Sequence, residues 1–152
     1  MAGNENITVV RLMEGRLAAC APGSDEHPQW LDEHDSRARL QEASAQRRTN
    51  VVFAAPGEDV RLQRLQISPE EKKHLEKSLP YMLEEQVAED VDGLHFATAP
   101  LGQLSYAVAL CSQAKMAQWQ EELAGFDSIG QWLPEPLLLP WQEGEWCLLF
   151  EG

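Results

Sequence analysis

The sequence predicts an α/β fold built from mixed sheets with flanking helices. Two kinds of pattern alternate along the chain: short alternating or β-branched runs, typical of strands, and longer stretches with helical spacing of apolar residues. The chain has 152 residues, of which 43% are hydrophobic, which is enough to form the core of one ordinary domain.

The first 67 residues contain five predicted strands and one predicted helix. The turn residues Glu14 and Gly15 separate the first two strands, and Pro56 and Gly57 stop the buried strand Val51–Ala55. The expected elements are strands at 7–13 and 16–20, a short edge strand near Trp30, a helix within 36–48, the strand at 51–55, and an exposed, arginine-bearing strand within 59–67.

The clearest helix is expected at residues 69–91. Ser68 and Glu71 form a capping-box pattern around Pro69 at the first helical position. Leucine, methionine and valine side chains recur on one face, at Leu75, Leu79, Met82, Leu83 and Val87. Pro80 lies within this range and predicts either a kink or two short helices in sequence.

The second half repeats the mixture of strands and helices. We expect strands at 94–100 and 103–111, a helix at 112–126 closed by Gly125, and a strand followed by a turn-like segment within 128–140. A further strand begins near Glu145, and the chain ends soon after it at Gly152. We therefore expect a C-terminal part that this chain lacks.

Net charge restricts the partners. Twenty-five acidic and twelve basic residues give a charge of −13, which repels the phosphate backbone of nucleic acids and anionic membrane surfaces. A basic protein partner would be attracted instead. The three cysteines lack metal-ligand spacing, and no apolar run is long enough for a signal peptide or a membrane span. These observations predict a soluble, cytoplasmic chain without a metal or cofactor.

The segment "LPYMLEEQVAEDVDGLHFA" at 79–97 concentrates carboxylates at Glu84, Glu85, Glu89, Asp90 and Asp92, followed by His95. A di-metal site would need paired motifs on long bundled helices, and an EF-hand would need more regularly spaced oxygen ligands. On a helix whose apolar residues face inward, the acids face solvent. A solvated acidic face is the simplest interpretation, and a docking surface for a basic partner is the second.

Four motifs between residues 56 and 140 resemble the cytoplasmic part of the L protein of bacterial type II secretion systems, the GspL family. They are "PGEDV" at 56–60, "LPYMLEEQ" at 79–86, "EDVDGLHFA" at 89–97 and "LPEPLLLP" at 133–140. The similarity is good over about 50–152 and loose before residue 50.

The resemblance implies an actin-like, RNase H-like fold, with 1–144 as the first lobe, 57–94 as an inserted strand–helix subdomain and 145–152 as the start of a truncated second lobe. It implies a non-catalytic adaptor that binds the N-terminal domain of the secretion ATPase GspE and the platform protein GspM, and it leaves a homodimer open. It further implies a place on the cytoplasmic side of the bacterial inner membrane, with the anchor in a segment outside this chain.

The residues expected at the partner-binding surface are Glu84, Glu85, Glu89, Asp90, Arg61 and Arg64. The two arginines belong to the exposed strand within 59–67, whose free edge offers another docking mode.

Actin-like folds usually bind ATP, so the alternative is a nucleotide-binding ATPase. The turn that would hold phosphate reads "MEGRLA", with Arg16 and Leu17 where small hydroxyl residues are required. This departure favours the adaptor, with no cofactor.

Overall fold

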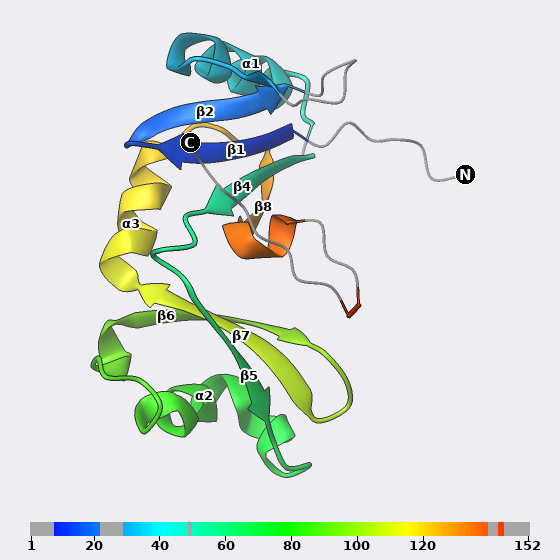
Figure 1. Ribbon diagram of the computed structural model, residues 1–152, viewed down its shortest axis with the longest axis vertical. Helices are drawn as coiled ribbons and strands as arrows, with labels where there is room; N and C mark the ends of the chain where they lie inside the picture. The colour runs from blue at the N-terminus through cyan, green and yellow to red at the C-terminus, as the bar shows by residue number, and fades with distance from the viewer. Residues whose placement is uncertain (1–7, 22–28, 49, 140–142, 145–152) are drawn as a thin grey trace. The chain divides into compact units, whose positions relative to one another are not determined.

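The computed structural model describes residues 8–21, 29–48, 50–139 and 143–144. The chain forms two compact units (Figure 1). The first unit comprises Met1–Gly57 and Ala124–Gly152, and the second comprises Glu58–Leu123. The expected assignment of 1–144 and 145–152 to two lobes, with 57–94 as an inserted subdomain, stays a prediction.

The first unit contains a five-stranded mixed sheet in the order β3-β2-β1-β4-β8. β1 pairs antiparallel with β2 and parallel with β4, and β4 pairs parallel with β8. The elements are β1 (Thr8–Met13), β2 (Arg16–Ala21), β3 (Gln29–Trp30), α1 (Glu33–Ala45), β4 (Val51–Ala55), β8 (Ile129–Pro134) and the 3₁₀ helix η3 (Glu135–Leu138).

β4 occupies the interior of this sheet, and all five of its residues are buried. A strand buried on both faces has a continuous apolar sequence, which is why "VVFAA" could be assigned without alternation. The strands expected at 7–13, 16–20, near Trp30 and at 51–55 are confirmed within the described residues.

α1 is joined to β2 by a buried serine. Ser36 is fully buried, its hydroxyl accepts a hydrogen bond from the Ala19 N–H at 2.8 Å, and it lies at 3.3 Å from the Leu31 carbonyl oxygen that it can donate to. The helix begins at Glu33, three residues before the predicted start, because the side chain of Asp32 caps it by accepting from the Asp35 N–H.

The second unit contains a three-stranded antiparallel sheet in the order β5-β7-β6. Its elements are β5 (Arg61–Gln66), the 3₁₀ helix η1 (Glu71–His74), α2 (Leu75–Glu84), the 3₁₀ helix η2 (Val91–Gly93), β6 (Leu94–Pro100), β7 (Ser105–Ser112) and α3 (Gln113–Glu122).

The apolar stripe of α2 packs on one face of this sheet, as predicted. Leu75, Leu79, Leu83 and Val87 are buried in one cluster, with exposed fractions between 0 and 9%. The sheet contributes the buried residues Leu65 and Ile67 from β5 and the link after it, Leu94 from β6, and Val108 and Leu110 from β7.

The helix predicted at 69–91 is wrong in its extent. The capping box exists: the Ser68 N–H donates to Glu71 Oε2 at 2.6 Å, and the Glu71 N–H donates to Ser68 Oγ at 3.3 Å. A 3₁₀ turn follows, α2 begins at Leu75, and it ends at Glu84. The junction of the two short helices is at His74, and Pro80 lies inside α2. Val87 is buried although its backbone is not helical. The apolar spacing therefore continues past the end of the helix, and the range predicted from it was too long.

Two of the quoted motifs meet in the first unit, 78 positions apart. The Gly57 N–H of "PGEDV" donates to Glu135 Oε2 of "LPEPLLLP" at 3.2 Å. The other carboxylate oxygen of Glu135 pairs with Arg11 Nη2 at 2.9 Å. A Cβ on Gly57 would lie 3.2 Å from Pro136 Cγ, so the close approach favours glycine. The strand expected to begin near Glu145 lies outside the described residues.

Candidate partner-binding surface

The four predicted carboxylates lie where α2 ends and in the loop that follows. Glu84 is the last residue of α2, Glu85 is its C-cap, and Glu89 and Asp90 lie in the loop before η2. All four are exposed. They do not share one face of a helix, because the backbone leaves helical geometry before Glu89. Glu85 and Glu89, four positions apart, are therefore not neighbours on a helix surface, as an i,i+4 pair would be.

Three of the six predicted residues line one cavity of the second unit. Its volume is about 630 Å³. Arg61 comes from β5, and Glu89 and Asp90 come from the loop after α2. Glu84, Glu85 and Arg64 are not among the residues that line it.

The same cavity contains charged residues that the sequence interpretation did not single out. Glu58 and Asp59 line it from the segment before β5, and Lys115 lines it from α3. Lys115 Nζ lies 3.0 Å from Asp59 Oδ2 and forms an ion pair with it. The other carboxylates that line the cavity are those of Glu58, Glu89 and Asp90. Glu58 directly precedes the strand predicted within 59–67 and Asp59 opens it, and the place of both acids in "PGEDV" was the available signal.

Cys111 also lines the cavity and is buried. Burial raises the pKa of its thiol, and the nearby Asp59 carboxylate raises it further. The thiolate is the nucleophilic form of cysteine, so this environment disfavours nucleophilic chemistry at Cys111.

The two predicted arginines lie on opposite faces of β5. Arg61 is paired with Leu110 and Arg64 with Ala107, and Leu110 belongs to the cluster under α2. Arg64 Nε donates a hydrogen bond to Ser105 Oγ at 2.8 Å, which fixes its direction along the sheet. β5 is an edge strand among the described residues, as expected.

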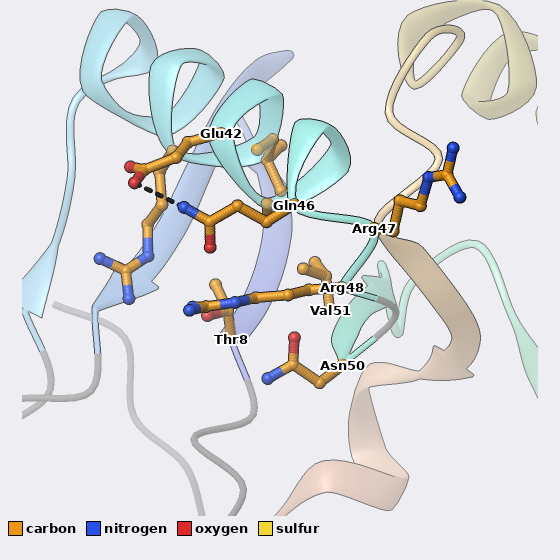
Figure 2. A pocket seen from close by; sticks show the side chains of 10 residues that line it. Thr8, Glu42, Gln46, Arg47, Arg48, Asn50 and Val51 are labelled. Atoms are coloured by element: carbon orange, nitrogen blue, oxygen red, sulfur yellow. Dashed lines mark hydrogen bonds between the residues drawn. The ribbon is translucent and has the colours of Figure 1, made fainter.

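A second hollow, in the first unit, is lined by three arginines (Figure 2). Its volume is about 730 Å³, and Arg39, Arg47 and Arg48 line it together with Gln46 and Glu42. Gln46 Nε2 donates to Glu42 Oε1 at 3.0 Å, and the side chain of Arg48 extends toward Thr8 while that of Arg47 points away.

The position of this arginine-lined hollow is unlike that of a nucleotide site. Thr8 and Val51, the first residues of the parallel strands β1 and β4, line it. Open α/β sheets bind ligands beyond the carboxyl ends of their parallel strands, which is the opposite edge. The hollow also adjoins the C-terminal end of α1, where the helix dipole is negative and disfavours an added anion.

At the carboxyl end of β1 the chain makes a two-residue turn. Met13 pairs directly with Arg16, and the turn residues Glu14 and Gly15 have φ values of 50° and 75°. Such a tight hairpin turn has no further backbone amides with which to surround a phosphate.

Within the described part of the chain, no group of three or more histidine, cysteine, aspartate or glutamate side chains is arranged to hold a metal ion. The helices of the same residues include none with the length and apolar character needed to cross a membrane.

Comparison with known proteins identifies relatives of one kind. The chain is 31% identical over 96 residues to the type II secretion system protein L of Dickeya chrysanthemi, a match that covers 62% of this chain and 24% of that protein. It is 32% identical over 101 residues to the protein L of Vibrio cholerae, covering 65% and 24% respectively. The chain thus matches about a quarter of the length of these relatives.

Among solved structures, the cytoplasmic domain of EpsL, an inner membrane component of the type II secretion system of Vibrio cholerae, has the same fold. The TM-score is 0.63 at 22% identity, over 90% of this chain and 60% of that one. The predicted α/β class, with mixed sheets and flanking helices, is confirmed, and the actin-like, RNase H-like kind stays a prediction.

The family model for protein L of the type II secretion system matches residues 29–152. This range includes the second unit and every residue of the candidate surface. The chain therefore belongs to the type II secretion system protein L family.

Proposed function

We propose that this chain is a non-catalytic adaptor that docks the N-terminal domain of the secretion ATPase GspE to the inner-membrane platform, on its cytoplasmic side. In this proposal the platform protein GspM is its second partner. Family membership supports a role within the secretion machinery, and the docking role rests on the surface described above.

The observation that carries the proposal is the state of the four carboxylates at the end of α2. Glu84, Glu85, Glu89 and Asp90 are all exposed, and none of the ion pairs among the described residues involves them. Asp90 accepts a hydrogen bond from the Asp92 backbone N–H, but like charges without an ion-pair partner still repel one another, and a basic partner would relieve that repulsion.

The adjoining cavity provides a space next to these carboxylates that a partner side chain can enter. Its carboxylates Glu58, Glu89 and Asp90 surround a space large enough for a lysine or arginine side chain, while Arg61 at its rim can pair with an acidic group of the same partner. Mixed charge of this kind favours one orientation of a partner over others.

The adaptor proposal excludes nucleotide turnover, and the tight β1–β2 turn supports that exclusion. Calorimetric titration separates the two functions. The purified chain should bind the isolated N-terminal domain of the ATPase and should give no heat of binding with millimolar Mg-ATP. A micromolar dissociation constant for Mg-ATP would replace the proposal with the ATPase alternative.

A further inference from the structure

Among the residues that the structure describes, β6 forms the second edge of the sheet in the second unit, and its outer side has no strand partner. The Leu101 N–H donates to the Ser105 carbonyl at 2.8 Å, and β6 and β7 continue from that pair in regular antiparallel register. Hydrogen-bonded pairs alternate along such a ladder, so Ala97 and Ala99 bond to β7 while the backbone groups of Phe96 and Thr98 point outward.

Two contacts agree with this assignment. Pro100, which has no N–H, occupies the next outward position, where an edge strand tolerates proline. The Leu94 carbonyl, outward by the same alternation, accepts from Gln113 Nε2 at 3.3 Å and so has a partner other than β7. The open part of the edge therefore begins at Phe96.

Over 96–99 this edge lacks the usual protection against pairing. Edge strands commonly carry lysines, inward-pointing charges, prolines or bulges that prevent association, and the proline of β6, Pro100, lies at the end of the strand. β5, the opposite edge, carries Arg61 and Arg64, whereas β6 reads "LHFATAP" without any acidic, lysine or arginine side chain. Residues 97–100 are nevertheless exposed. An unprotected, exposed edge indicates a strand that is covered when the protein is assembled.

An apolar groove runs beside the same edge. Its volume is about 360 Å³, and α2 lines it with Leu75, Leu79 and Pro80. β6 lines it with Leu94, His95, Phe96 and Thr98. Leu94, Phe96 and Thr98 lie on the face of β6 that α2 covers, and His95 lies on the opposite face, so the groove lies between α2 and β6 and reaches the edge of the strand. Glu76 adds a carboxylate to its lining.

We propose that the β6 edge and this groove together bind an extended segment of another protein by β-strand addition. The backbone of the segment would pair with Phe96 and Thr98, and one of its apolar side chains would enter the groove between α2 and β6. Glu76 and the net charge of −13 favour a basic residue next to that apolar anchor. The groove shares Leu94 with the acidic cavity but is lined by none of the six residues predicted for the partner-binding surface, and the proposal extends the proposed function to a second docking mode.

Selection of peptides on the purified chain tests the proposal. A displayed library of random ten-residue peptides is the probe, and the enriched peptides should carry an apolar residue flanked at alternate positions by lysine or arginine. Thr98→Pro removes an outward N–H and should weaken binding about tenfold, the factor for losing one ordinary hydrogen bond. Thr98→Ala keeps the N–H but shortens a side chain that lines the groove, so it separates the backbone contribution from the side-chain contribution and should weaken binding less than Thr98→Pro.

Peptides with single N-methylated amides provide a test on the wild-type chain, independent of how Thr98→Pro folds. Methylation should abolish binding at alternate positions only, since alternate amides of an added strand face β6. Failure to enrich any peptide, equal binding by Thr98→Pro, or tolerance of methylation at every position would overturn the proposal. A dimer of the free chain that Thr98→Pro dissociates would also overturn it, because the occupant would then be a second copy.

Discussion

Leu83 is, with Val108, one of the fully buried residues in the core of the second unit. It is fully buried in the cluster between α2 and the three-stranded sheet. Its neighbour Tyr81 on the same helix is 75% exposed. The two side chains therefore separate the contribution of the core from that of the helix surface.

Replacing Leu83 by alanine should lower the free energy of unfolding by about 2–5 kcal/mol, because the removed atoms leave a cavity that neighbours fill only partly. Tyr81→Ala is the control and should change it by less than about 0.5 kcal/mol. Urea unfolding followed by circular dichroism measures both. Equal effects of the two substitutions would mean that α2 is oriented differently.

At the same scale, sequence patterns predicted the buried leucines but missed Ser36. Leu75, Leu79 and Leu83 recur at helical spacing, which periodicity detects directly. Ser36 is buried because the Ala19 N–H of a distant strand needs an acceptor there. That need arises only once α1 and β2 are side by side, so no local pattern contains it.

Among the elements, the capping box at Ser68 shows what local sequence determines. The pKa of Glu71 is lowered because its carboxylate accepts the Ser68 backbone N–H and also interacts with the Ser68 hydroxyl. A carboxyl group whose pKa is lowered by folding stabilises the folded state above its ordinary pKa. This stabilisation is lost as the pH falls through the lowered value.

We expect the titration midpoint of Glu71, followed by carbon NMR, to lie below the ordinary glutamate range. Ser68→Ala removes the hydroxyl and should raise that midpoint part of the way, because the backbone bond remains. It should also destabilise the protein by about 0.5–2 kcal/mol through loss of the cap. An ordinary midpoint in the wild-type chain would contradict the capping geometry.

A second prediction at the scale of elements concerns Glu135, the first residue of η3. Its carboxylate contacts Arg11 on β1 and the Gly57 N–H just after β4. Arg11 and Glu135 are both largely buried, with side-chain exposures of 17% and 24%, and Glu135 also accepts from Gly57. A double-mutant cycle with Arg11→Met and Glu135→Gln should give a coupling free energy of about 0.5–3 kcal/mol. Additive effects of the two substitutions would show that the pair contributes no coupling.

The presence and type of each helix and strand were predicted more reliably than its length or its contacts with other elements. β4 has the predicted bounds because Pro56 and Gly57 end it locally. The helix was predicted to extend to Val91, but it stops at Glu84. Val87 lies in the same core with a non-helical backbone, and apolar periodicity cannot distinguish this arrangement from a longer helix. The cavity combines Asp59, Asp90 and Lys115 from three segments, and only the pairing of β5, β6 and β7 brings them together.

For the whole molecule, net charge is the property that links sequence to the proposed partner. A charge of −13 attracts any cation, so long-range attraction alone cannot distinguish one surface from another. The central claim is that the carboxylates at the end of α2 meet the ATPase. Its test must therefore change charge at that surface and, separately, by the same amount elsewhere.

The most direct measurement is the association rate of the purified chain with the N-terminal domain of the secretion ATPase, by stopped flow at low ionic strength. Glu85→Lys with Glu89→Lys should slow association several-fold. The effect should shrink at physiological salt, where the Debye length falls to about 8 Å. The control, Glu121→Lys with Asp127→Lys, reverses two other exposed carboxylates and changes the net charge equally, so it should have a smaller effect. An unchanged rate for the first pair, or equal slowing by both pairs, would contradict docking at this surface.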